Sequence, residues 1–195
     1  AGNGQLTVSF TPPTDAGVGS GGITKYRIYA NGRQQLEFTP DCTVTSGTEN
    51  GAVEKVGNKY KVTLKGLANG SGYLVQATAF NQYGESPLGT GASGVPATVP
   101  DAPRNVIVTA TSDTSIHVSW KAPLYQGGDG VKSYQLKLYQ VGADEEPLKT
   151  VETVNGLEYD FGTSADDKLA YGTSYYCKVA ARNKIDLGEA AKSNE

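Results

Sequence analysis

Apolar and polar residues alternate over short stretches along the whole chain. Residues 5–10 (QLTVSF) and residues 115–120 (SIHVSW) both place an apolar side chain at every second position. A period of two is typical of a β-strand with one buried and one solvent-facing side. The same alternation returns around Tyr26 and Tyr134, whereas we find no helical period of useful length. The sequence therefore predicts an all-β protein.

The alternating stretches form two copies of one unit of roughly a hundred residues. Residues 72–86 match residues 174–190 in the same register, displaced by 102 positions, and residues 5–13 match residues 115–123. The register pairs Tyr73, Val75, Ala77, Ala79 and Asn81 with Tyr175, Cys177, Val179, Ala181 and Asn183. We expect two tandem domains, residues 1–98 and residues 99–195.

Turn-forming residues separate the expected strands. Asn31-Gly32 lies between two alternating stretches, and this dipeptide is a strong hairpin signal because both central residues of the turn need positive φ. A Leu and a Gly-containing turn precede each tyrosine strand, at residues 67–70 and 169–172. Short strands with a turn about every 8 to 12 residues indicate a β-sandwich.

These features together resemble the fibronectin type III family, and the resemblance covers nearly the whole chain. The second unit carries the family's Trp120, its Leu-x-x-Gly turn and the tyrosine that follows, and the first unit has Phe10 in place of the tryptophan. The resemblance implies an immunoglobulin-like sandwich in each unit, with tyrosine corners at Tyr73 and Tyr175. It also implies a structural role for Phe10, Tyr26, Tyr73, Trp120, Tyr134 and Tyr175.

The first unit departs from the family pattern at its beginning. Gly2-Asn3-Gly4 corresponds to the turn that normally follows the opening strand, so the first sandwich should lack that strand. An absent edge strand leaves backbone groups unpaired and part of an apolar face uncovered. We expect an upstream segment of a longer protein, or a neighbouring chain, to supply it. The prolines at 96, 100 and 103 predict a short, semi-rigid link between the units.

Composition and charge exclude several classes of partner. The 195 residues carry a formal net charge of -3, so we expect no nucleic-acid partner, which would select for a basic patch. No stretch approaches the roughly 18 consecutive apolar residues of a membrane span, so we expect no membrane insertion of this segment. Cys42 and Cys177 lie in different units and cannot form a disulfide within either one.

No arrangement of residues predicts catalysis or a cofactor. His117, the single histidine, alternates with inward-facing neighbours and should face solvent, which is unsuitable for a catalytic triad. The acidic groups 144–146 and 166–167 fall in expected loops and are interpreted as solvated turns. One histidine and two separated cysteines cannot form a closed zinc site. Calcium stays open as a weak alternative at Asp129 and at residues 166–167, without the regular spacing of a calcium loop.

The glycine-rich turn at residues 69–72 has three possible interpretations. A phosphate-binding loop would require a following helix, whereas a strand follows here. Asn69-Gly70-Ser71 is formally an acceptor for N-glycosylation, which stays open. The repeat favours an architectural turn that directs Tyr73 into its corner.

The loops at the ends of the sandwiches are the candidate contact sites. Those after the tyrosine strands are residues 81–86 (NQYGES) and 183–189 (NKIDLGE), with Tyr83, Lys184 and Asp186 as possible partner contacts. We expect a non-enzymatic structural and interaction segment of a longer stalk, adhesin or display protein of bacterial or phage type, exposed outside the cell, at the cell surface or on a virion. Two alternatives are a virion decoration or tail protein completed by a neighbouring chain, and a spacer in a secreted carbohydrate-active enzyme.

Overall fold

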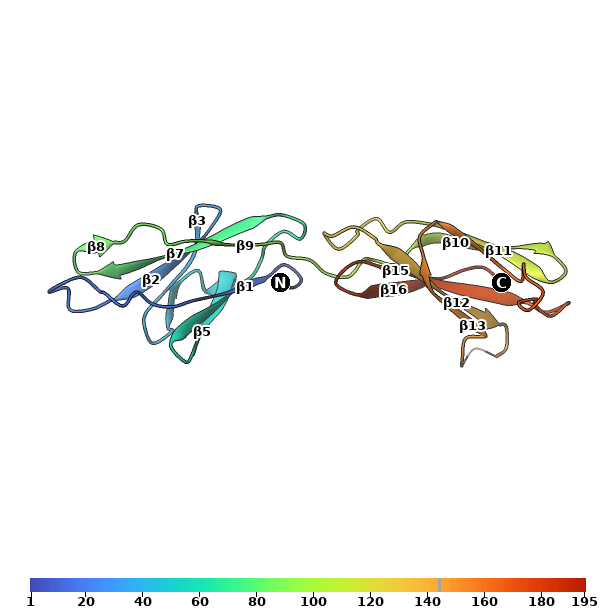
Figure 1. Cartoon of the computed structure of the whole chain (residues 1–195), viewed down its shortest axis with the longest axis horizontal. Helices are drawn as coiled ribbons and strands as arrows, with labels where there is room; N and C mark the ends of the chain where they lie inside the picture. The colour runs from blue at the N-terminus through green and yellow to red at the C-terminus, as the bar shows by residue number, and fades with distance from the viewer. Residues whose placement is uncertain (144) are drawn as a thin grey trace. The chain divides into compact units, whose positions relative to one another are not determined.

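The computed structural model describes residues 1–143 and 145–195, which form two compact units, Ala1–Ala97 and Thr98–Glu195 (Figure 1). Each unit is a β-sandwich, so the predicted all-β class is confirmed. The only helical element among the described residues is one short 3₁₀ turn, η1 (Thr48–Asn50).

The first domain consists of a three-stranded sheet, in the order β1-β6-β5, packed on a sheet in the order β4-β3-β2-β7. Two short strands, β8 and β9, both pair with β7. All pairings are antiparallel. The strands are β1 (Leu6–Phe10), β2 (Lys25–Ala30), β3 (Arg33–Phe38), β4 (Val44–Ser46), β5 (Gly51–Val56), β6 (Lys59–Leu64), β7 (Tyr73–Asn81), β8 (Gly84–Glu85) and β9 (Ala92–Gly94).

The second domain has sheets in the orders β10-β11-β14 and β13-β12-β15-β16, again with antiparallel pairing. Its core lies between these sheets and includes Trp120, whose ring meets the ring of Tyr134 at 5.3 Å. The strands are β10 (Arg104–Ser112), β11 (Ser115–Lys121), β12 (Ser133–Gln140), β13 (Lys149–Val154), β14 (Glu158–Phe161), β15 (Tyr175–Arg182) and β16 (Leu187–Lys192).

Four aromatic rings form the centre of the first domain's core. The Phe10 ring lies 5.6 Å from both Tyr26 and Tyr60, and Phe38 stacks on Tyr26 at 5.2 Å. The Tyr60 hydroxyl donates to the Pro40 carbonyl at 2.8 Å, which satisfies the polar end of a buried ring. Burial, reinforced by the neighbouring Tyr60, raises the pKa of Tyr26 to about 12.

The β2–β3 hairpin forms as its sequence predicts. Asn31 and Gly32 have φ values of 50° and 75°, the left-handed conformations that a tight two-residue turn needs. The Asn31 side chain also donates to the Gly72 carbonyl and accepts a hydrogen bond from the Leu74 amide. This turn therefore also fixes the start of β7.

The first domain has no counterpart of β10. In the second domain β11 lies between β10 and β14, whereas β1, which corresponds to β11, pairs with β6 alone. The correspondence is structural as well as sequential, because Leu67 donates to the Gly4 carbonyl and Leu169 donates to the Thr114 carbonyl, each at 2.9 Å. The prediction that the first sandwich lacks its opening strand is confirmed.

Each domain has a tyrosine whose hydroxyl binds the backbone of the preceding turn. The Ala68 amide donates to the Tyr73 hydroxyl and the Ala170 amide to the Tyr175 hydroxyl, both at 3.0 Å. This is the geometry of a tyrosine corner. The Tyr175 ring is buried and the Tyr73 ring half-buried.

The Tyr175 corner should stabilise the second domain measurably. Removing one hydroxyl by Tyr175→Phe should lower the free energy of unfolding by about 1 kcal/mol, the typical net value of one such bond. Urea unfolding followed by the fluorescence of Trp120, the single tryptophan, reports on the second domain. Tyr73→Phe is the matched control and should leave this transition in place. A shift with Tyr73→Phe, or none with Tyr175→Phe, would contradict the assignment.

Candidate interaction loops

An asparagine at the end of each tyrosine strand anchors the following loop. Asn81 accepts from the Tyr83 amide at 2.8 Å and donates to the Ala16 carbonyl at 2.9 Å. Asn183 accepts from the Ile185 amide at 2.9 Å and donates to the Gln126 carbonyl at 3.2 Å. In the first domain the Asn81 side chain joins residues 81–86 to the loop between β1 and β2. In the second domain the Asn183 side chain joins residues 183–189 to the loop between β11 and β12. The two loops therefore form one surface at the end of each sandwich.

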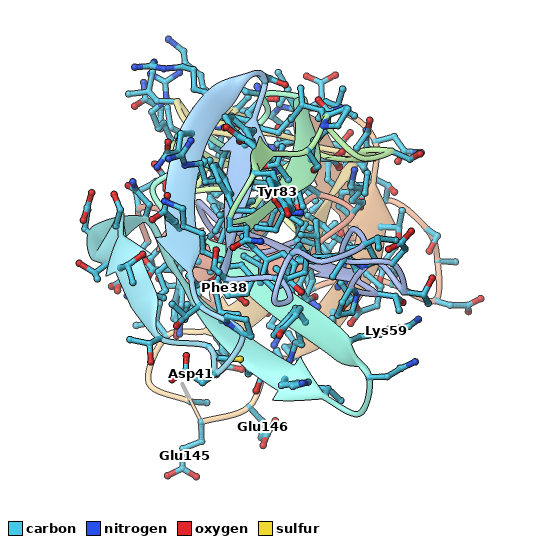
Figure 2. The ribbon with its side chains drawn as sticks, turned by 90° about the vertical axis from the view of Figure 1, so that its left-hand side faces the viewer. Phe38, Asp41, Lys59, Tyr83, Glu145 and Glu146 are labelled. Carbon is cyan, nitrogen blue, oxygen red and sulfur yellow. The ribbon has the colours of Figure 1, made fainter. Side chains whose placement is uncertain are left out.

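Tyr83 lies at the exposed end of the first domain, which Figure 2 views directly. Its side chain is 73% exposed, and Val18 on the adjoining loop is 96% exposed. The two loops are in contact, because the Gln82 side-chain Nε2 donates to the Gly19 carbonyl at 2.7 Å and the Tyr83 hydroxyl lies 3.4 Å from the same oxygen. An aromatic and an aliphatic side chain are thus displayed on neighbouring loops.

The Val18 loop takes its shape from glycine. Gly17, Gly19, Gly21 and Gly22 all have φ between 70° and 101°, a region that other residues rarely adopt. Ser20 is buried within the loop and donates to the Ala16 carbonyl at 2.6 Å. Val18 was absent from our predicted contacts, although the run GVGSGG (residues 17–22) around it could have identified an exposed loop tip.

Charged and polar side chains hold the Tyr83 hairpin against the outer face of the sheet. Glu85 on β8 accepts from the Tyr29 and Thr78 hydroxyls, each at 2.7 Å, and pairs with Arg27 at 3.1 Å. Hydrogen bonds from Thr78 and Tyr29 lower the pKa of Glu85, so this carboxylate stays ionised under physiological conditions. The Arg27 guanidinium also lies 4.4 Å from the centroid of the Phe80 ring, a cation–π contact.

In the second domain, Lys184 and Asp186 lie in the predicted loop but point to different partners. Lys184 pairs with Asp129 of the adjoining loop, with its Nζ 2.9 Å from Oδ1. Asp186 accepts from the Leu187 amide at 2.7 Å and pairs with Arg182 at 3.3 Å. Both side chains stay mostly exposed. Both residues therefore form ion pairs within this domain, and these pairs hold the loop in place.

The carboxylates considered for calcium bind lysines. Asp129 pairs with Lys184, while Asp167 pairs with Lys149 and also accepts from the Gly162 amide at 3.0 Å. Within residues 1–143 and 145–195, no three His, Cys, Asp or Glu side chains gather in a group that could hold a metal. Asp144, one of the acidic residues interpreted as a solvated turn, lies outside the described residues.

His117 lies on β11, and acidic groups face both of its ring nitrogens. Its Nδ1 is 2.7 Å from Asp160 Oδ1 and its Nε2 is 3.9 Å from Glu158 Oε2. Asp160 is the direct cross-strand partner of His117, and Thr109 is the partner on the other side. The histidine is therefore held by cross-strand pairing on a sheet face rather than within a cleft. This geometry provides a hydrogen bond between His117 and Asp160 on the surface of the sheet.

The Asn69 side chain takes part in the fold of the first domain. Its Oδ1 accepts from the Gly4 amide at 2.8 Å and its Nδ2 donates to Asn3 Oδ1 at 2.7 Å. Both ends of the amide group thus join the turn after β6 to the turn before β1. Addition of a glycan would modify the nitrogen that makes one of these bonds.

The paired sheets, tyrosine corners and anchored loops define a tandem module of immunoglobulin-like sandwiches. The family model for the fibronectin type III domain matches residues 1–94 and residues 101–194. The chain therefore belongs to the fibronectin type III family, with two domains in tandem.

Relatives that the chain resembles include animal proteins. It is 32% identical to neogenin of Rattus norvegicus over 150 residues, which is 69% of this chain and 10% of neogenin. It is 29% identical to protein sidekick-2 of Mus musculus over 179 residues, 91% of this chain and 8% of the relative. It is 28% identical to the cell adhesion molecule Dscam2 of Drosophila melanogaster over 170 residues, which is 86% of this chain and 8% of Dscam2. The chain spans a tenth or less of the length of these relatives.

A solved structure shares the fold. Domains A168–A170 of titin superpose with a TM-score of 0.62 over 100% of this chain and 59% of the titin chain, at 17% sequence identity. At this identity the likeness concerns the fold alone. Among the described residues, no helix has the length and apolar character needed for a membrane crossing.

The Asp129–Lys184 pair makes a prediction about titration. Hydrogen bonding from Lys184 lowers the pKa of Asp129 below its ordinary 3.8, so the pair stabilises the loops above that pH and is lost as the pH falls through the lowered pKa. Lys184→Met should therefore raise the pKa of Asp129 toward 3.8, as measured by NMR of its carboxyl carbon. Lys132→Met is the control and should have a smaller effect, since Lys132 lies 4.0 Å from this carboxylate. Equal shifts in the two variants would contradict this account.

Proposed function

We propose that this chain is a non-enzymatic interaction segment of a larger, surface-exposed protein. The observation that carries the proposal is the pair of anchored loops in the first domain, which displays Val18 and Tyr83 to solvent. Tyrosine is enriched among the residues that dominate protein-binding surfaces, and such residues commonly lie on loops positioned by a rigid frame. The partner class we propose is therefore a protein, reached outside the cell or at the cell surface.

The relatives support the cell-surface setting. They come from animals, and one of them is a cell adhesion molecule. This favours an adhesion-type protein over the bacterial or phage setting that we considered from the sequence. No observation favours a virion decoration or tail protein, or a spacer in a carbohydrate-active enzyme. The stalk role, in which each sandwich contributes a spacing and its loops make contacts, is part of the same proposal.

A bead-adhesion assay tests the proposal. Fluorescent beads coated with the chain should bind to a panel of animal cells, and binding should fall several-fold in the double variant Val18→Ser, Tyr83→Ser. Tyr171→Ser is the matched control, because Tyr171 is 78% exposed but belongs to the turn before β15. This control should bind as the unaltered chain does.

Three results decide the outcome. Loss of binding only in the loop variant supports the first-domain surface. Loss only in the double variant Lys184→Ala, Asp186→Ala would transfer the contact to the second domain. No adhesion to any cell type, or adhesion that neither loop variant changes, would overturn the assignment of these loops as contact sites.

A further inference from the structure

Five asparagines of the chain are followed directly by glycine: Asn3, Asn31, Asn50, Asn69 and Asn155. This pair is prone to spontaneous deamidation, because glycine has no Cβ to hinder its backbone nitrogen from approaching the preceding side chain. The glycine nitrogen gives up its proton and attacks the side-chain Cγ, which closes a five-membered succinimide and expels the amide nitrogen as ammonia. Water then opens the ring to aspartate or isoaspartate. The surroundings of each pair in the fold decide which asparagine can react.

Two of these side chains are anchored by hydrogen bonds to the backbone of the first domain. The Asn31 Nδ2 donates to the Gly72 carbonyl at 3.0 Å, and its Oδ1 accepts from the Leu74 amide at 2.8 Å. The Asn50 Nδ2 donates to the Gln35 carbonyl at 2.8 Å. Each side chain would have to leave these partners before it could turn toward its own glycine. The hydrogen bonds therefore protect both residues from the reaction.

Asn3 and Asn69 protect each other, and the glycines that follow them are held as well. The Asn69 Nδ2 donates to Asn3 Oδ1 at 2.7 Å, and the Asn69 Oδ1 accepts from the Gly4 amide at 2.8 Å. The Gly4 nitrogen, which is the attacking atom for Asn3, is thus bound to the other side chain. The Gly70 nitrogen, which is the attacking atom for Asn69, donates to the Pro96 carbonyl at 2.8 Å. Both side chains and both attacking nitrogens are therefore restrained.

Asn155 lacks these restraints. It lies in the turn between β13 and β14 and is exposed. Among the residues that the structure describes, its side chain has no hydrogen-bond partner, and the Gly156 amide makes no turn or loop hydrogen bond to the backbone. Exposure alone does not distinguish this site, since Asn3 and Asn31 are exposed too. The difference is that the Asn155 side chain can rotate toward its glycine without breaking a hydrogen bond.

We propose that Asn155 is a deamidation site, at which the folded protein acquires aspartate or isoaspartate while the four other Asn-Gly pairs stay intact. The only co-reactant is water from the solvent. Each event adds one negative charge to a chain whose formal net charge is -3. The new charge lies in a turn that is followed by Glu158 and Asp160. This inference does not depend on the loop contacts proposed above.

The isoaspartate product also changes the backbone of the second domain. Its main chain continues through Cβ and Cγ, which adds one atom to the short connection between β13 and β14. The Leu157 carbonyl in this connection accepts from the Trp120 amide at 3.0 Å, and Trp120 lies in the core. An extra main-chain atom two residues before Leu157 should disturb this hydrogen bond. The modification should therefore lower the stability of the second domain.

Ageing of the purified chain at neutral pH tests the proposal. Mass spectrometry of digested samples, with chromatographic separation of the isomers, measures aspartate and isoaspartate at each of the five positions. Asn155 should react about fivefold faster or more than each of the other four, since no hydrogen bond has to break first. In concentrated urea, which removes the fold, this difference should largely disappear. An equal or faster reaction at another position of the folded chain, or the same difference in urea, would overturn the proposal.

Two variants test the site and its consequence separately. Gly156→Ala adds a methyl group next to the attacking nitrogen and should slow the reaction at Asn155 several-fold. The fold accepts this methyl group, whose nearest neighbours would be Glu158 O and N at 3.8 and 3.9 Å. An unchanged rate in Gly156→Ala would contradict the proposed site.

Asn155→Ser removes the reacting amide. Ageing should lower the urea midpoint of the unaltered chain, followed by the fluorescence of Trp120, but not that of Asn155→Ser. An equal fall of the midpoint in both chains would overturn the effect on stability.

Discussion

The burial of one sheet face against another is the constraint on which both domains depend. A strand with a period of two can bury only alternate residues, so each sandwich needs two facing sheets that cover each other completely. The second domain meets this condition at Val118 and Trp120, because β10 closes the gap beside β11. In the first domain the two sheets cover each other at the centre of the core, where four aromatic rings pack together. Along β1 the cover is incomplete, since Val8 and Phe10 are only half-buried.

The loops depend on the same frame for their order. Asn81 and Asn183 stand at the ends of central strands, so the hydrogen bonds that they make to adjoining loops start from well-fixed positions. Glycines then allow the Val18 loop conformations that other residues avoid. The anchored base and the glycine conformations of the tip together leave the Val18 and Tyr83 side chains exposed to solvent. Contact residues on such loops can vary without changing the sandwich.

Local pattern was sufficient to predict the fold. Alternation identified the core-facing sides of β1, β7, β11 and β15, although β15 also buries Tyr176 and Ala180 on its other side. The Asn31-Gly32 pair predicted its hairpin, and the repeat predicted the tandem arrangement. The absent strand could also be predicted, because the turn at residues 2–4 matches a turn that has a strand before it in the second unit. Apart from the comparison of the two units, which are displaced by 102 positions, these signals lie within a few residues of the feature that they predict.

The contents of the core and the site depend on pairing between distant segments, which a single sequence does not display. Phe38 and Tyr60 were missing from our expected structural residues, although both alternate with polar neighbours, because alternation marks a side chain as buried without showing which rings it meets. Strand register places Tyr60 opposite Phe10 and Phe38 opposite Tyr26. Likewise, the pairing of Lys184 with Asp129 joins two loops 55 residues apart. Alternation identifies which side of a strand is buried, but register decides which side chains meet there.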